Sequence, residues 1–178
     1  MKNTILSLIA LFLVGCATPG SNGIETTGEG DDFEDEIRIS SYQFSRNYLG
    51  IVYAENAHPF FRAYVTKDDR NIRDLQLYVR TNNYDWMYWD EVRYRKNGEL
   101  HRINMSNVSR DVDCSSYICQ NAEDIVGSIP LELLEYIAQK EGDYEIRITS
   151  SRSSGHIDAT IPTDEARDFL AALNDVRN

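Results

Sequence analysis

The sequence predicts a mainly β protein: an antiparallel β-sandwich of immunoglobulin-like or transthyretin-like topology. Two short helices are expected with it, the last at the C-terminus. Several short segments alternate apolar and polar residues at the period of a half-buried strand. Turn-forming residues separate these segments at the close spacing that sandwiches show. Only two segments carry apolar residues at helical spacing.

The first half of the folded part is expected to consist of strands. A strand begins at Ile37, where apolar residues alternate with polar ones. A short apolar run at 48–53 follows, and the turn-forming residues at 56–59 interrupt it. Segments 60–66 and 72–80 alternate most regularly and are separated by a polar turn. Each therefore has one face for a core and one for solvent, as in antiparallel sheets.

The densest aromatic stretch of the chain lies at 84–95. Large side chains occur there at both parities, which predicts a central strand or a bulge at which the strand changes face. The pair Asn97-Gly98 follows, and it is the pair that tight hairpin turns prefer. The sequence therefore predicts a β-hairpin with its turn at 96–99 and a returning strand at 100–105.

The remaining residues are expected to form a polar loop, three strands and the two helices. The loop covers 106–120 and carries two cysteines, and the first strand is the apolar segment 125–129. Pro130 suits the first turn of a helix that Gly142 ends. Thr163 is expected to cap the C-terminal helix. The two alternating strands between the helices cover 144–149 and 156–161.

The N-terminus has the features of a secretory signal. Lys2 precedes an unbroken apolar run at 5–14, which is shorter than the roughly 20 apolar residues of a spanning helix. The run ends in Leu-Val-Gly-Cys at Cys16. These four residues resemble the lipobox of bacterial lipoproteins.

The resemblance implies that a peptidase cuts before Cys16, and that this residue is acylated and becomes the mature N-terminus. The protein would then be held to the membrane by lipid alone. Ala17 follows the cysteine, where this class often carries aspartate if the protein stays on the inner membrane. The resemblance thus favours the outer membrane, with the domain facing the periplasm or the cell surface.

Three parts of the chain follow from these patterns. By the lipobox resemblance, residues 1–15 would be the lipoprotein signal peptide. Residues 16–36 are expected to be a lipidated flexible tether, because they are rich in Gly, Ser, Thr and acids and poor in large apolar residues. Residues 37–178 are expected to form a single β-rich domain, which is long enough for one core.

The charge of the chain argues against one class of partner. The formal net charge is −11, and residues 25–36 contain seven acids and no base. Nucleic-acid binding needs a basic surface, so no nucleic-acid partner is expected.

Cysteine usage predicts one disulfide. If Cys16 carries lipid, Cys114 and Cys119 remain, and an oxidising exported compartment favours their pairing. A zinc site is the alternative, but the histidines show no ligand spacing around these cysteines. We therefore expect no metal and no cofactor.

No catalytic motif of the hydrolase, zinc-protease or P-loop kind is present, so the sequence predicts no catalytic residue. The aromatic stretch supplies the candidates for binding, since Trp and Tyr suit both sugars and protein hot spots. Packing in the core is the alternative, and two or more adjacent exposed rings would favour binding. The candidates are Tyr84, Trp86, Tyr88 and Trp89.

The leading hypothesis is a non-catalytic lipoprotein whose tethered domain binds another envelope protein or supports an assembly. In its overall organisation, a lipid anchor followed by a small sandwich domain, the chain resembles the lipidated adaptor domains of secretion systems. It shares no motif with them within 37–178. One alternative is a glycan- or peptidoglycan-binding module that uses the aromatic stretch. A more remote alternative is a hydrolase without a known motif.

Overall fold

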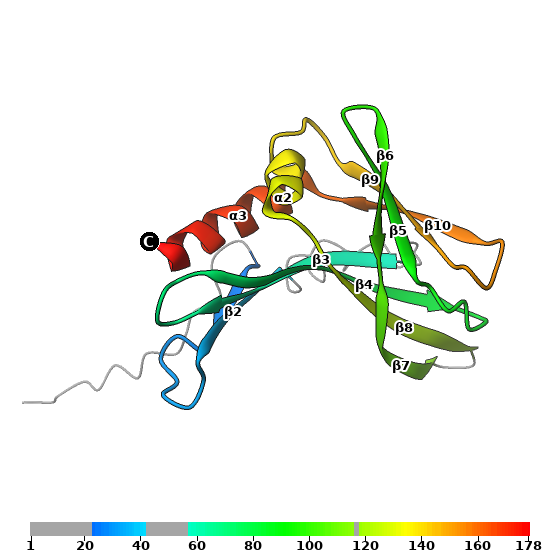
Figure 1. Cartoon of the computed structure of the whole chain (residues 1–178). Coiled ribbons are helices and arrows are strands. Elements are labelled where there is room, and N and C mark those ends of the chain that lie inside the picture. Colours follow the sequence, from blue (N-terminus) through cyan, green and yellow to red (C-terminus); the bar gives the residue numbers. More distant parts are fainter. Residues whose placement is uncertain (1–22, 42–56, 116–117) are drawn as a thin grey trace, which may run out of the picture.

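The computed structural model describes residues 23–41, 57–115 and 118–178. The predicted signal peptide, Cys16 and the apolar run at 48–53 lie outside these residues. Within them, the chain forms two antiparallel sheets and two helices, the last at the C-terminus (Figure 1). The predicted mainly β sandwich is confirmed.

The larger sheet has six strands. Their order across the sheet is β1 (Glu25–Thr27), β2 (Glu36–Ser40), β3 (Ala57–Thr66), β4 (Ile72–Asn83), β8 (Ile118–Ser128) and β7 (Ser106–Ser115). The smaller sheet has four strands, in the order β10 (His156–Ile161), β9 (Tyr144–Thr149), β5 (Glu91–Lys96) and β6 (Glu99–Asn104). The helices are α2 (Leu131–Ala138) and α3 (Thr163–Arg177).

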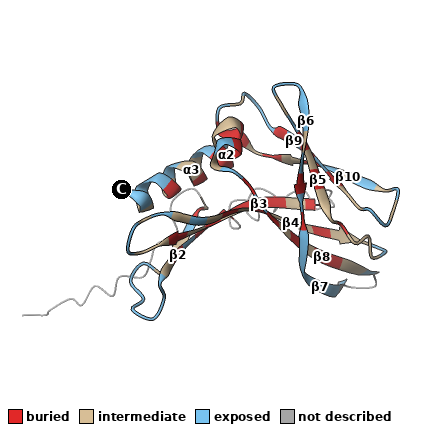
Figure 2. Cartoon of the chain, in the orientation of Figure 1, coloured by how far each residue is buried: buried red, intermediate tan, exposed pale blue. Residues whose placement is uncertain are grey.

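The helices and the smaller sheet together form the second layer. Helix α3 contacts β2 and β3 of the larger sheet, α2 contacts α3, and β10 contacts β3. Figure 1 shows the helices over one half of the larger sheet and the smaller sheet crossing the other half. The core lies between the layers, where Phe61 of β3 and Phe169 of α3 have ring centroids 5.5 Å apart. Figure 2 shows most buried residues where the layers meet.

The alternating segments behave as the sequence predicts, with one difference. The apolar positions of 60–66 and 72–80 are buried in β3 and β4. However, β3 begins at Ala57. His58 and Pro59, which the sequence predicted to form a turn, therefore belong to this strand. Pro59 pairs with β4, and the pairing of β3 with β2 extends only from Arg62 to Thr66. Because a proline has no N–H to donate, this one-sided position suits it.

The folded part extends further toward the N-terminus than the tether prediction of 16–36 allows. Strand β1 lies within that range and pairs with β2, with Thr26 opposite Ile39. Ile24, just before it, is a buried core residue. The tether prediction gave no weight to Ile24, whose burial in the core stabilises the docking of this segment.

The predicted polar loop at 106–120 is wrong. Instead β7 and β8 form a long hairpin, and Cys114 and Cys119 face each other across it. Their Sγ atoms lie 2.15 Å apart, at disulfide distance, as predicted. Strand β7 is the edge of its sheet, and its described side chains are exposed on both faces. Because neither face is buried, the sequence of β7 shows no alternation that would identify it as a strand.

The C-terminal half otherwise follows the predicted order. Helix α2 begins after Pro130, and β9 and β10 pair as neighbours. Thr163 does not cap α3 but is its first residue, after Pro162. Its Oγ1 accepts a hydrogen bond from the guanidinium of Arg167.

Candidate functional site

The predicted binding stretch forms the connection between the two sheets. Strand β4 ends at Asn83 and β5 begins at Glu91, so residues 84–90 leave one sheet and enter the other. The prediction of a central strand is correct only from Glu91 onward. Tyr88 has a φ of 57°, which lies in the left-handed region. A strand cannot continue through this conformation, and a bulky residue rarely adopts it.

The four predicted binding residues are not presented together. Tyr84 is 71% exposed, whereas Trp86 and Tyr88 are half-buried. Trp89 is 2% exposed and belongs to the core, as the alternative interpretation of this stretch had it. Among these residues the structure therefore offers one open ring and two partly covered ones.

A buried carboxylate determines the backbone of this connection. Glu123 of β8 is fully buried, and its Oε1 accepts hydrogen bonds from the N–H groups of Met87 at 2.7 Å and Tyr88 at 3.1 Å. The hydroxyl of Ser150 donates to the carbonyl oxygen of Tyr88 at 3.0 Å. These bonds hold Tyr88 on both sides of its Cα. Unusual backbone conformations that are secured from several sides are concentrated at functional sites.

Two arginines stack on the Tyr88 ring. The Cζ atoms of Arg110 and Arg152 lie 4.7 and 5.1 Å from its centroid. Arg110 comes from β7 and Arg152 from the loop between β9 and β10. Nε of Arg110 also lies 3.7 Å from Oε2 of Glu123, which is an ion-pair distance. We call Tyr88, Arg110, Arg152 and the buried Glu123 the Tyr88 cluster.

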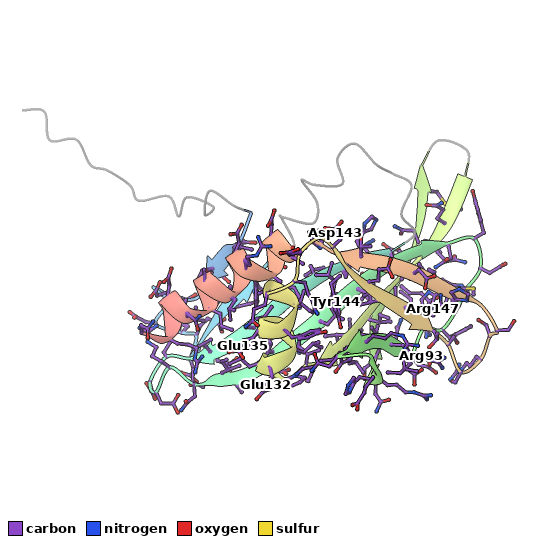
Figure 3. All side chains as sticks on the ribbon, turned by 90° about the horizontal axis from the view of Figure 1, so that it is seen from above. Arg93, Glu132, Glu135, Asp143, Tyr144 and Arg147 are labelled. Carbon is purple, nitrogen blue, oxygen red and sulfur yellow. A yellow bond between two sulfur atoms is a disulfide. The ribbon has the colours of Figure 1, made fainter. Side chains whose placement is uncertain are left out.

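A second group of arginines lies on the outer face of the smaller sheet. Arg102, Arg93 and Arg147 are direct neighbours on β6, β5 and β9, and Asp158 follows on β10. Figure 3 shows Arg93 and Arg147 on this side of the molecule. Beside them is a hollow of about 760 Å³, lined also by Tyr144 and by further charged side chains.

Acidic side chains satisfy this second group. Glu91 accepts a hydrogen bond from Arg93 at 2.5 Å and forms an ion pair with Arg102 at 3.4 Å. Asp158 binds Arg147 through two hydrogen bonds of 2.6 and 2.8 Å. The hydrogen bonds from these arginines hold the pKa values of Glu91 and Asp158 below their usual range. Each of these arginines thus has a carboxylate partner, as is ordinary on the solvent face of a sheet.

The sequence did not reveal most of these groups. The predicted hairpin register already placed Arg93 opposite Arg102, so this pair could have been found. Glu123 could have been suspected, because it lies two residues before the core residue Ile125 on the same face of β8. No local pattern shows that Arg110 and Arg152 meet at one ring.

The described residues contain no group of three or more His, Cys, Asp or Glu side chains that could hold a metal ion. His58 lies in β3, and its burial and the nearby Arg80 lower its pKa. His101 stacks on Tyr94 with centroids 5.3 Å apart, and His156 begins β10.

The chain was also compared with known proteins. No family model, curated protein or solved structure matches it. No helix in the described ranges is long and apolar enough to cross a membrane.

Proposed function

We propose that this protein is a non-catalytic envelope lipoprotein, anchored in the outer membrane through acylated Cys16, whose β-sandwich binds another envelope protein. The binding surface is the end of the sandwich formed by residues 84–90, the hairpin β7–β8 and the loop between β9 and β10. The anchor would hold the domain near the outer membrane.

One observation carries the proposal: Tyr88 lies against two arginines in a backbone conformation that the buried Glu123 fixes. Tyr, Trp and Arg are the residues most enriched at binding hot spots between proteins. A side chain already held in place loses little conformational entropy when a partner binds it. The cluster therefore has both the composition and the rigidity of a hot spot.

The exposure of the rings favours a protein partner over a glycan. A sugar platform needs adjacent open aromatic faces, but only Tyr84 among the four candidates is largely exposed. Tyr88 instead stacks with guanidinium groups. Glycan binding through Tyr84 and the half-buried Trp86 is the second candidate function.

Affinity capture tests the proposal. The mature lipidated protein, in mild detergent, is used to capture partners from native envelope, beside Tyr84→Ala and Phe33→Ala variants. Both substituted rings are exposed, at 71% and 97%, but Phe33 lies in the loop between β1 and β2, away from the proposed surface. We expect a protein partner whose recovery falls severalfold with Tyr84→Ala and is unchanged with Phe33→Ala.

The possible outcomes separate the hypotheses. Equal recovery with both variants would place the contact elsewhere and contradict the proposed surface. Recovery of cell-wall glycan alone, lost with Tyr84→Ala, would establish the second candidate. A Cys16→Ala chain exported by a cleavable signal should lose the partner in cells and regain it when fused to another membrane tether. Capture of nothing, together with turnover of an envelope substrate, would replace the proposal with an enzyme.

A further inference from the structure

We propose that Arg110 and Arg152 form an anion-recognition site that binds a carboxylate on an acidic segment of a partner protein. This inference rests on the proposed function for the kind of partner, but the binding of a carboxylate can be measured without knowing that partner.

The two guanidinium groups have no hydrogen-bond acceptor among the groups that the structure describes. Arg110 forms the ion pair with Glu123, and Arg152 contacts the Tyr88 ring. A guanidinium presents five N–H donors in a planar fork that matches a carboxylate. The cation–π contact with the Tyr88 ring provides no oxygen or nitrogen acceptor for these donors.

Both arginines are also held in position. Arg110 is part of the β7–β8 hairpin, whose far end the Cys114–Cys119 disulfide closes. The loop that carries Arg152 is fastened by Ser151, whose backbone N–H donates to Asp90 at 3.0 Å. Each Cζ lies about 5 Å from the same ring centroid, so the two groups are less than 10 Å apart and within the span of one short acidic segment.

The contrast with the other arginines identifies this pair. Arg93, Arg102 and Arg147 have Glu91 and Asp158 as acceptors, so an incoming anion would have to displace an existing carboxylate. Near Tyr88, two backbone N–H groups already bind the carboxylate of Glu123, and Ser151 binds that of Asp90. Among the described residues Arg152 therefore has no acid at ion-pair distance, and its guanidinium can receive an incoming carboxylate.

The neighbours of the site indicate that an apolar residue accompanies the acid. Val112 lies two residues after Arg110 on the same face of β7 and is 51% exposed. It pairs with Asn121, whose amide donates to the carbonyl oxygen of Tyr84 at 3.0 Å. An extended partner segment with a carboxylate at one position and an apolar side chain about 7 Å away would contact both features.

A pair of labelled peptides tests the site directly. The probe is Glu-Val-Glu-Val-Glu and its control is Gln-Val-Gln-Val-Gln, each with a fluorescent label and both blocked at their ends. Binding to the mature lipidated protein in mild detergent is followed by anisotropy at 0.15 M salt. At that ionic strength the Debye length is about 8 Å, so repulsion from distant acids of the chain is screened. We expect binding of the Glu peptide only.

Three single substitutions separate the site from the net charge. Arg152→Gln and Arg110→Gln should each weaken binding by about tenfold or more, because each removes charge-assisted hydrogen bonds. Arg177→Gln removes the same charge from the exposed end of α3 and should have no effect. Arg152 is exposed and has no ion pair within the described ranges, so its variant is expected to fold even if that of Arg110 does not.

Several results would overturn the inference. Equal binding of the Glu and Gln peptides, or an equal loss with Arg177→Gln, would show that no specific carboxylate site exists. Direct binding of inorganic phosphate without any binding of the Glu peptide would replace the carboxylate with a phosphate. Capture of a partner that Tyr84→Ala reduces and Arg152→Gln does not would contradict this site alone. Specific peptide binding without any captured protein would contradict the proposed function alone.

Discussion

Two fully buried glutamates differ in how the protein accommodates them. Glu123 receives backbone N–H donors and an arginine at ion-pair distance. Glu165, in the first turn of α3, receives one hydrogen bond from the hydroxyl of Ser41, and its Oε2 has no partner among the described residues. Burial raises the pKa of Glu165 to about 8, against smaller opposing effects of Ser41 and the Phe61 backbone. Glu165 is therefore largely protonated in the folded protein at neutral pH.

The stability of the protein should depend on pH through Glu165. The pKa of this carboxyl rises from an ordinary 4.5 to about 8 on folding, so between these values the native state holds a proton that the unfolded chain has lost. Its contribution to stability is complete below pH 4.5 and falls as the pH rises toward 8, by up to about 1.4 kcal/mol per pH unit. Glu165→Gln should remove this slope. Urea unfolding of both proteins from pH 5 to 9 measures it, and parallel slopes would contradict the assignment.

The spacing of residues in α3 indicates that Glu165 is buried, but its charge suggests a position at the surface. An acid in the first turn of a helix is expected at the surface, where the helix dipole favours it. Yet Glu165, Phe169 and Leu173 are spaced four residues apart and share the buried stripe of α3. Periodicity thus locates this side chain correctly, whereas residue type does not.

The elements that local chemistry determines were predicted best. The hairpin β5–β6 turns at Asn97 and Gly98, with φ of 53° and 86°, as its sequence indicated. The alternating strands β3, β4 and β9 were also correct, because each has one buried face. The edge strand β7 and the connection at 84–90 were missed. Neither follows a strand periodicity, and contacts with distant residues determine their conformations.

The hairpin turn should be sensitive to backbone conformation alone. A Cβ added at Gly98 would meet no atom within 4 Å, so Gly98→Ala changes only the cost of the left-handed conformation. We expect a loss of about 1–2 kcal/mol in the free energy of unfolding. Gly30→Ala is the matched control, since a Cβ there also meets nothing and its φ is not positive. Equal urea midpoints for the two variants would show that the turn does not require this conformation.

At the scale of the whole molecule, the two sheets come into close contact at Gly127. A Cβ on this residue of β8 would lie 2.6 Å from a methyl carbon of Ile103 and 2.7 Å from the carbonyl oxygen of Asn104. The chain passes from β6 to β7 through Met105 alone, so it has little freedom to move away there. The order of strands in the sheets depends on such crossings, which no local pattern in the sequence reveals.

Gly127→Ala should therefore disrupt the packing between the two sheets at this contact. We expect a loss of about 3 kcal/mol in the free energy of unfolding, at the upper end of the usual cost of overpacking, because one of the clashing atoms is backbone. In an Ile103→Ala background, which lacks that methyl carbon, Gly127→Ala should cost less but should still destabilise, since the carbonyl oxygen of Asn104 stays in place. Chemical denaturation of the single and double variants measures both effects. A neutral Gly127→Ala, in either background, would contradict this account of the contact.

Strand β1 also changes how far the proposed lipoprotein can act. Only six residues, 17–22, separate the acylated cysteine from Gly23, where the described part of the chain begins. The seven steps from residue to residue, at most about 3.6 Å each, span no more than roughly 25 Å. The linker would then keep the domain within a thin layer above the lipid headgroups. Within that layer a membrane-bound partner would meet it at high effective concentration, so even a weak contact at the Tyr88 cluster would be occupied.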